Sequence, residues 1–268
     1  MSRTDAVKVL FLGNSHTYYN DMPLLFQEIC RDRGKEVEVR MIAQSGVTYR
    51  WHLNHMIELR FELMYGGYDF LVMQQAAHGA PPTKEETHRD GHEIAEMARR
   101  FGTVPIQTVP WAEKKFPEHQ AGMYEIFESF AEKENIRLNP VGRIFEEVSR
   151  SHPEINMYWT DGEHASPYGT YATALCAYAA IFGESVADVT VVHSRETYPL
   201  SQEGWERVQA AYAYASAHPE QPELEKEADK AWDRECPVVM DPKEAVVSLD
   251  PEKAKILREL TDRFVLGL

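Results

Sequence analysis

The sequence predicts an α/β protein with a mainly parallel sheet that helices cover on both faces. Short β-rich apolar runs alternate with longer segments of helical periodicity from residue 7 onwards, which is typical of βαβ units. Glycine and proline residues mark where the runs end. The chain has 268 residues, of which 43% are hydrophobic, so it can bury a sizeable core within one α/β domain.

The expected strands are short runs of β-branched and other apolar residues. They span residues 7–12, 37–42, 70–73, 104–109 and 136–138. The first run ends at Gly13. Pro105 weakens the fourth run, because proline cannot donate a hydrogen bond within a sheet, and Pro110 closes it.

The expected helices lie between these strands and continue after the last one. They span residues 23–33, 50–64, 84–100, 118–134, 170–182, 203–217 and 251–264. The segment 218–233 is rich in Pro, Glu and Lys, which predicts an exposed connector or a charged helix. We therefore expect an α/β domain over residues 1–217 and a helical extension over residues 218–268 that packs on the same domain.

Charge and cysteine content exclude several classes of function. The formal net charge of -15 argues against a nucleic-acid partner and against docking on an anionic membrane. Three widely spaced cysteines without a CxxC motif argue against a disulfide framework or a cysteine-rich zinc site. No apolar run resembles a signal peptide or a membrane span, so we expect a soluble cytoplasmic protein; a chain whose leader had been removed would look the same.

The end of the first expected strand holds a candidate nucleophile. Gly13-Asn14-Ser15-His16 follows the strand directly, and functional groups of open α/β sheets lie beyond the carboxyl ends of the strands. Gly13 permits a sharp turn, after which Ser15 would be exposed and its own N–H would be free to bind an anion. The alternative is that Ser15 serves only as a helix N-cap.

A second segment can supply the base that a serine nucleophile needs. Asp161 and His164 lie three residues apart in a turn-rich loop before a late helix. Such a loop can place the carboxylate on one imidazole nitrogen and leave the other facing Ser15. The alternative is a surface loop in which Asp161 only forms a turn.

Taken together, GNS after the first strand and DxxH before a late helix resemble the first and last sequence blocks of the SGNH (GDSL-like) hydrolase superfamily. The strings FLGNSHTYYNDMP and DGEHASPYGTYATAL are similar to a bacterial branch of that superfamily, over about residues 7–183. The resemblance implies a flavodoxin-like, three-layer α/β/α sandwich with a five-stranded sheet. It also implies a Ser-His-Asp triad of Ser15, His164 and Asp161, and no cofactor.

The middle blocks of the family map less directly onto this chain. Gly46 matches by position the glycine that donates to the oxyanion, although it could be an ordinary loop glycine. Where the family has an asparagine after the third strand, this chain has Met73-Gln74-Gln75. A glutamine amide has the same donor chemistry, so we expect Gln74, or as second choice Gln75, to complete the oxyanion hole.

Other polar and aromatic residues are candidates for contact with substrate. We assign Asn14, His16, His78 and Trp111 to substrate binding, while Tyr18 and Tyr19 either line the cleft or belong to the core. His88 and His92 have helical i, i+4 spacing, which can bind zinc, but a solvated helix face is the favoured interpretation. We expect no metal site.

The sequence thus predicts a serine esterase that removes a small acyl group, with an O-acetyl group on a carbohydrate as one candidate. The expected partner is a small-molecule or carbohydrate ester. Two alternatives stay open. One is a non-catalytic module of the same fold, which the missing asparagine favours. The other is a metal-dependent hydrolase that uses Asp161, His164 and further histidines.

Overall fold

The computed structural model describes residues 6–77, 83–221 and 223–268. Within these ranges, five parallel strands form one sheet in the order β2-β1-β3-β4-β5. The strands are β1 (Val7–Gly13), β2 (Val37–Ala43), β3 (Phe70–Met73), β4 (Val104–Thr108) and β5 (Arg137–Asn139). This is the flavodoxin-like strand order, so the predicted five-stranded parallel sheet is confirmed.

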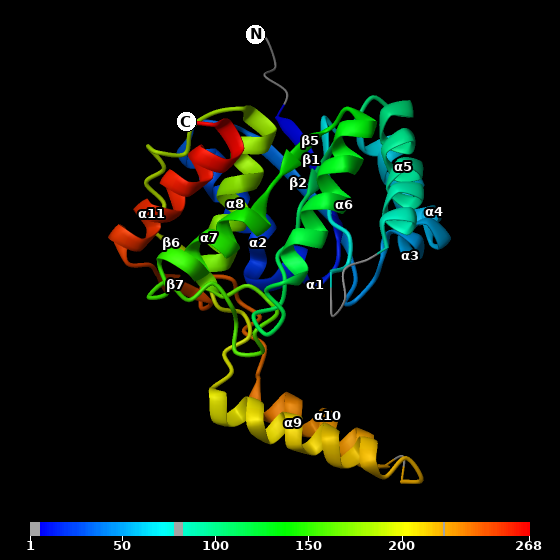
Figure 1. The fold of residues 1–268 in the computed structure, drawn as a ribbon, viewed down its shortest axis with the longest axis vertical. Helices are drawn as coiled ribbons and strands as arrows, with labels where there is room; N and C mark the ends of the chain where they lie inside the picture. The colour runs from blue at the N-terminus through cyan, green and yellow to red at the C-terminus, as the bar shows by residue number, and fades with distance from the viewer. Residues whose placement is uncertain (1–5, 78–82, 222) are drawn as a thin grey trace.

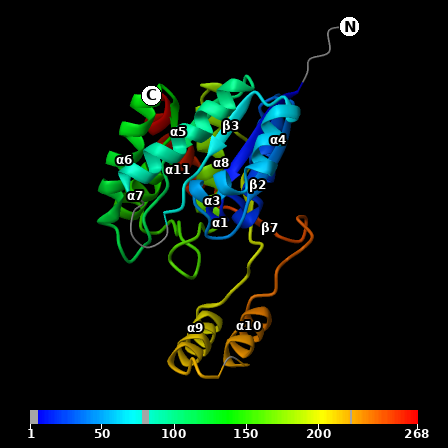
Figure 2. The same ribbon diagram turned by 90° about the vertical axis from the view of Figure 1, so that its right-hand side faces the viewer.

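Helices cover both faces of this sheet and make three layers (Figures 1 and 2). One face packs against α2 (Met22–Asp32), α7 (Val141–Ser151) and α8 (Pro167–Phe182), and α11 (Pro251–Thr261) packs on α8 and α7. The other packs against α3 (Tyr49–Asn54), α4 (Met56–Gly66), α5 (Lys84–Arg100) and α6 (His119–Glu134). Alternating residues of β1 serve both cores, because successive side chains point to opposite faces: Val9 and Phe11 to the first, Leu10 and Leu12 to the second.

Several elements differ from the sequence-based expectation. The helix expected over residues 50–64 is interrupted at His55, whose φ of -106° and ψ of 34° are not helical, so two helices form. Helix α7 was not expected, although Val141, Ile144, Phe145 and Val148 give its buried stripe. The short strands β6 (His193–Arg195) and β7 (Val246–Ser248) were not expected either; they pair antiparallel in a second, small sheet.

The chain between β6 and β7 leaves the body and returns to it. It forms α9 (Gln202–Ala217) and α10 (Glu223–Glu235), which lie side by side as a hairpin. The hairpin projects from the edge of the body that holds α1 (Ser15–Tyr18) and η1 (Tyr19–Asp21) (Figure 1). The chain then returns through α11 and η2 (Asp262–Leu266), which pack beside α8.

Two sequence-level expectations concern residues now placed in this fold. Cys30, Cys176 and Cys236 are all buried and form no disulfide. Among the described residues, no helix is both long enough and apolar enough to cross a membrane.

Candidate active site

The turn after β1 fixes the position of Ser15. Asn14 caps α1: its Oδ1 accepts from the His16 N–H at 3.1 Å, and its Nδ2 donates to the Val47 carbonyl at 3.1 Å. A side chain at Gly13 would not fit, because a Cβ there would lie 2.2 Å from Thr17 Oγ1 and 2.8 Å from Gln74 Oε1. The first backbone N–H groups of a helix have no partner within the helix, so the N–H of Ser15, the first residue of α1, has no intrahelical acceptor.

Asp161 and His164 meet in one tight loop before α8. Asp161 Oδ1 accepts from the backbone N–H groups of Glu163 and His164, at 2.8 and 3.0 Å. Its Oδ2 lies 2.6 Å from His164 Nδ1. Gly162 allows the turn with a φ of +75°, and the His164 carbonyl accepts from the Trp159 N–H at 2.8 Å. The same carboxylate therefore shapes the loop and orients the imidazole.

The structure brings Ser15, His164 and Asp161 into one hydrogen-bonded row. Ser15 Oγ lies 2.8 Å from His164 Nε2. In the tautomer that donates its Nδ1–H to Asp161, Nε2 holds a lone pair and can accept a hydrogen bond from the serine hydroxyl. The row lies at the carboxyl end of β1, where the strand order reverses between β2 and β3. Ligands of open α/β sheets bind at this switch point.

Aromatic rings enclose the His164 imidazole. Tyr19 stacks on the His164 ring at a centroid distance of 4.2 Å, and Tyr198 stacks on the other side of Tyr19 at 4.3 Å. Trp159 stands edge-on to both His164 and Tyr19. It also contacts Trp205 of α9 and Trp232 of α10, each at 6.1 Å, so the base of the hairpin packs on the wall behind His164.

His16 and Glu163 form a second polar pair beside the row. The His16 ring stacks on Trp111 at 4.7 Å and is 6% exposed, and its burial lowers its pKa, which favours the neutral imidazole. Its Nε2 lies 3.6 Å from Glu163 Oε1. Trp111 Nε1 donates to the Glu163 carbonyl at 2.7 Å. Sequence reasoning assigned no role to Glu163, although it lies inside the DxxH motif.

A small cleft of about 170 Å³ opens over the serine. The described residues that line it come from the ends of β1, β2 and β3 and from the loop before α8: Asn14, Ser15, His16, Ser45, Gly46, Ala76, Ala77, Glu163 and His164. Gly46 has a φ of +68°, a conformation that glycine adopts without strain. Trp111 does not line the cleft but supports His16 from behind.

The structure does not bring the two glutamine amides into this cleft. Gln74 Oε1 accepts from Thr17 Oγ1 at 3.0 Å, and its Nε2 donates to the Gln75 carbonyl. Gln75 Oε1 accepts from the Tyr49 and Ala76 N–H groups, at 2.8 and 3.1 Å. Both amides brace the loops under the serine, and Ala76 and Ala77 form the wall where an amide donor was expected. His78 lies outside the described residues.

Among the residues that the structure describes, two groups of side chains offer ligand atoms close enough for a metal ion. His16, Glu163 and His164 have nitrogen and carboxylate atoms within 4.8 Å of one another, and so do His92, Glu96 and Glu134 on the surface. His88 does not join the second group, because its Nε2 lies 3.0 Å from the Ile126 carbonyl. The i, i+4 histidine pair is thus not brought onto a common ion.

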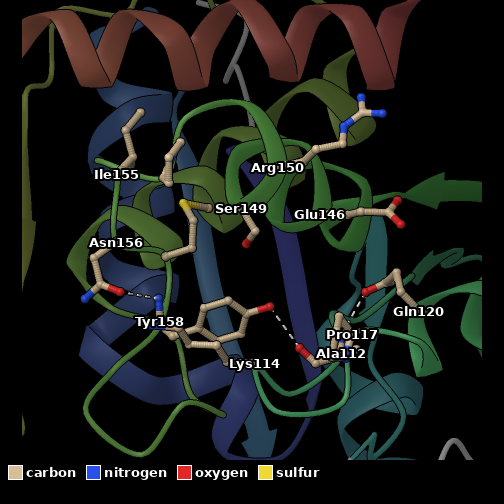
Figure 3. A pocket seen from close by; sticks show the side chains of 12 residues that line it. Ala112, Lys114, Pro117, Gln120, Glu146, Ser149, Arg150, Ile155, Asn156 and Tyr158 are labelled. Atoms are coloured by element: carbon tan, nitrogen blue, oxygen red, sulfur yellow. Dashed lines mark hydrogen bonds between the residues drawn. The ribbon is translucent and has the colours of Figure 1, made fainter.

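A larger cavity of about 620 Å³ is lined by Ala112, Lys114 and residues of the segment that leads from α7 to Tyr158 (Figure 3). Tyr158 forms part of its lining and donates to the Ala112 carbonyl at 3.0 Å, while Lys114 and Asn156 border it. None of Ser15, Asp161 and His164 lines this cavity. We therefore place the candidate active site in the smaller cleft, which Ser15 and His164 line.

Comparisons with known proteins agree with this geometry at the level of the fold. No family model matches the chain, and a search of curated proteins found no match. Among solved structures, the chain is similar to a proposed SGNH hydrolase from Slackia heliotrinireducens, with 26% identity, a TM-score of 0.59, and coverage of 66% of this chain and 100% of that one.

Two further solved structures cover different shares of the chain. A DUF4886 family protein from Bacteroides uniformis is 18% identical with a TM-score of 0.56, and the match covers 86% of this chain and 94% of that one. A mutant of an acetyl-xylooligosaccharide esterase from Geobacillus Stearmophilus is 14% identical with a TM-score of 0.57, over 69% of this chain and 98% of that one. With its strand order, its layers and these neighbours, the chain has the fold of the SGNH (GDSL-like) hydrolases.

Proposed function

We propose that this protein is a serine esterase that removes a small acyl group, with Ser15 as nucleophile, His164 as base and Asp161 as its support. One observation carries the proposal: the Ser15 hydroxyl, the His164 imidazole and the Asp161 carboxylate form an unbroken row, with contacts of 2.8 and 2.6 Å. A nucleophile, a base in reach and a group that orients the base are what acyl transfer by serine requires.

The reaction would proceed in two transfers. Ser15 Oγ attacks the ester carbonyl while its proton moves to His164 Nε2, and the imidazolium then gives that proton to the leaving alcohol. Water repeats the sequence on the acyl-serine and releases the carboxylic acid. Asp161 stays ionised and stabilises the imidazolium, for which a charge-assisted bond of 2.6 Å is well suited.

Backbone groups are the proposed donors to the oxyanion. The N–H groups of Ser15 and Gly46 both belong to residues of the cleft wall. The glutamine amides already have partners, so we assign the hole to these two backbone donors rather than to a side-chain amide. Fixed donors of this kind act where negative charge develops and need no reorganisation.

The size of the cleft supports a small acyl group. A space of about 170 Å³ is of the size that holds benzene, so it accommodates an acetyl or another short acyl group but not a long chain. The acetyl-xylooligosaccharide esterase among the structural neighbours makes a carbohydrate O-acetyl ester the first natural substrate to test. We also propose a cytoplasmic location, which the three buried and unbridged cysteines support.

Steady-state hydrolysis of p-nitrophenyl acetate tests the assignment. Ser15→Ala should lose turnover while it keeps the circular dichroism and unfolding temperature of the wild type, because removal of one hydroxyl at the cleft leaves no large cavity. Ser216→Ala, on the exposed part of α9, is the matched control and should keep full activity. Turnover in folded Ser15→Ala would exclude the mechanism, and no turnover in the wild type would favour a non-catalytic module of the same fold.

A further inference from the structure

The pair beside the catalytic row has features that acyl transfer leaves unexplained. His16 lies in α1, directly after β1, and Glu163 lies in the loop before α8; both line the cleft, and His16 Nε2 lies 3.6 Å from Glu163 Oε1. His16 is 6% exposed, and its ring is held between Trp111, on which it stacks, and the edge of His164. A rigid imidazole that faces a carboxylate across a cleft is a common arrangement of metal ligands.

The separation of His16 and Glu163 is close to that of two ligands of a tetrahedral ion. Ligand atoms about 2.0–2.2 Å from zinc lie about 3.4 Å from one another in this geometry. His16 Nε2 and Glu163 Oε1 lie 3.6 Å apart. His164 is the third candidate: each of the three side chains offers a ligand atom within 4.8 Å of those of the other two, so the His164 nitrogen would have to approach by at most about 1.4 Å.

His164 also has the partner that histidine ligands usually have. Metal-binding histidines as a rule donate their other ring N–H to a carboxylate, which fixes the tautomer and makes the ligand nitrogen more basic. Asp161 Oδ2 accepts from His164 Nδ1 at 2.6 Å and so leaves the lone pair on Nε2. The contact that prepares this nitrogen to accept the serine proton therefore prepares it equally well for a cation.

We propose that His16, Glu163 and His164 form an inhibitory site for a divalent transition-metal ion of the zinc class. The proposal rests on the proposed function, because inhibition follows from the role of His164 as base. An ion on Nε2 takes the lone pair that accepts the Ser15 proton, and it occupies the mouth of the cleft where the ester must enter. Two imidazoles and one carboxylate favour Zn²⁺, Co²⁺, Ni²⁺ or Cu²⁺ over Mg²⁺ and Ca²⁺, which prefer all-oxygen sites.

Cobalt absorption tests the site without any need for catalysis. Co²⁺ in a four- or five-coordinate protein site gives visible d–d bands far stronger than those of the hydrated ion. The full-length chelator-treated protein and its Ser15→Ala variant should both show such bands, since Ser15 is not a ligand in the proposal. Glu163→Gln and His16→Ala should weaken Co²⁺ binding at least tenfold. Equal bands in all four proteins, or none in the wild type, would overturn the site.

Zinc inhibition of p-nitrophenyl acetate hydrolysis tests whether the bound ion blocks the esterase reaction. Zn²⁺ should inhibit the wild type, and inhibition of Glu163→Gln should need a Zn²⁺ concentration at least about tenfold higher. The rate of each variant is compared with its own rate without zinc. His92→Ala is the matched control, because it removes the surface group of His92, Glu96 and Glu134 and should leave the inhibition unchanged. Loss of inhibition in His92→Ala alone would overturn the proposal.

The remaining outcomes separate this proposal from the proposed function. If chelation abolishes turnover and Zn²⁺ restores it, the ion is a cofactor, and both the inhibitory role and the metal-free mechanism fail. If the wild type has no esterase activity but its Co²⁺ bands depend on Glu163, the metal site stands and the hydrolase fails. If esterase activity is present and insensitive to Zn²⁺, the hydrolase stands and the inhibitory site fails.

Discussion

Replacement of Asp161 by asparagine separates two roles of this side chain. It removes the negative charge and the acceptor that orients His164, but it keeps the hydrogen bonds that hold the loop. The Oδ1 atom of asparagine can still accept from the two backbone N–H groups that now lie at 2.8 and 3.0 Å. The second terminal atom becomes an NH₂ donor where Oδ2 now accepts from His164 Nδ1 at 2.6 Å. Nδ1 must then accept, which puts the proton on Nε2, so the imidazole would point an N–H at Ser15 instead of a lone pair.

The wrong tautomer and the lost counter-charge act on the same step. In Ser-His-Asp enzymes this change lowers kcat about 10⁴-fold with the geometry intact, which corresponds to roughly 5.5 kcal/mol of transition-state stabilisation. The free energy of unfolding should change far less, by about 1 kcal/mol or below, because the loop keeps both of its backbone hydrogen bonds. Activity and stability are therefore expected to separate clearly.

The measurements are kcat with p-nitrophenyl acetate and the urea midpoint of unfolding. Asp250→Asn is the matched control: Asp250 caps α11 through the N–H groups of Glu252 and Lys253, and asparagine caps equally well, so neither quantity should change. If Asp161→Asn keeps kcat within tenfold of the wild type at unchanged stability, His164 does not work as the base supported by Asp161, and the reasoning is refuted.

Three further changes test the surroundings of the row. Gly13→Ala should lower the stability by about 1–3 kcal/mol and reduce kcat, since a Cβ 2.2 Å from Thr17 Oγ1 must displace the nucleophile turn; unchanged urea midpoint and kcat would contradict this. Gln74→Ala should destabilise the protein by about 1–3 kcal/mol, because it leaves the buried Thr17 hydroxyl without its acceptor; a loss of kcat at unchanged stability would instead indicate an amide in the oxyanion hole. Finally, kcat/KM should fall at least about tenfold from acetyl to decanoyl p-nitrophenyl esters, because a cleft of about 170 Å³ is of the size that holds benzene and a ten-carbon chain must extend beyond it; equal values would show that the cleft opens further.

The fold was predictable because its pattern is local. Apolar runs such as residues 7–12 and 70–73 form the buried central strands, and their alternation with helices fixes a parallel, two-faced sheet. The missed elements depend on tertiary contacts or on short signals. Strands β6 and β7 have three residues each. They form by pairing with one another where the chain leaves the body toward α9 and where it comes back after α10. The stripe of α7 could have been found from its periodicity.

The site was predictable in its chain order but not in the direction of its side chains. The conformations of Gly13-Asn14-Ser15 and of the loop from Asp161 to His164 are determined mostly by nearby residues. Each is a tight turn whose capping hydrogen bonds are made within a few residues or to the adjacent loop. The orientation of the Gln74 amide instead depends on Thr17, 57 positions away. Likewise, the approach of Glu163 to His16 requires two loops to fold against each other, which no local pattern shows.

Covalent labelling with a fluorophosphonate tests the central claim most directly. Such probes react with a serine only when a neighbouring base makes it nucleophilic and an oxyanion site receives the phosphoryl oxygen. Intact-protein mass spectrometry of the wild type should show one probe per chain, and peptide mapping should place it on Ser15, with no adduct on Ser15→Ala. Absence of labelling on the folded wild type, or an adduct of equal yield on Ser15→Ala, would contradict the assignment of Ser15 as an activated nucleophile.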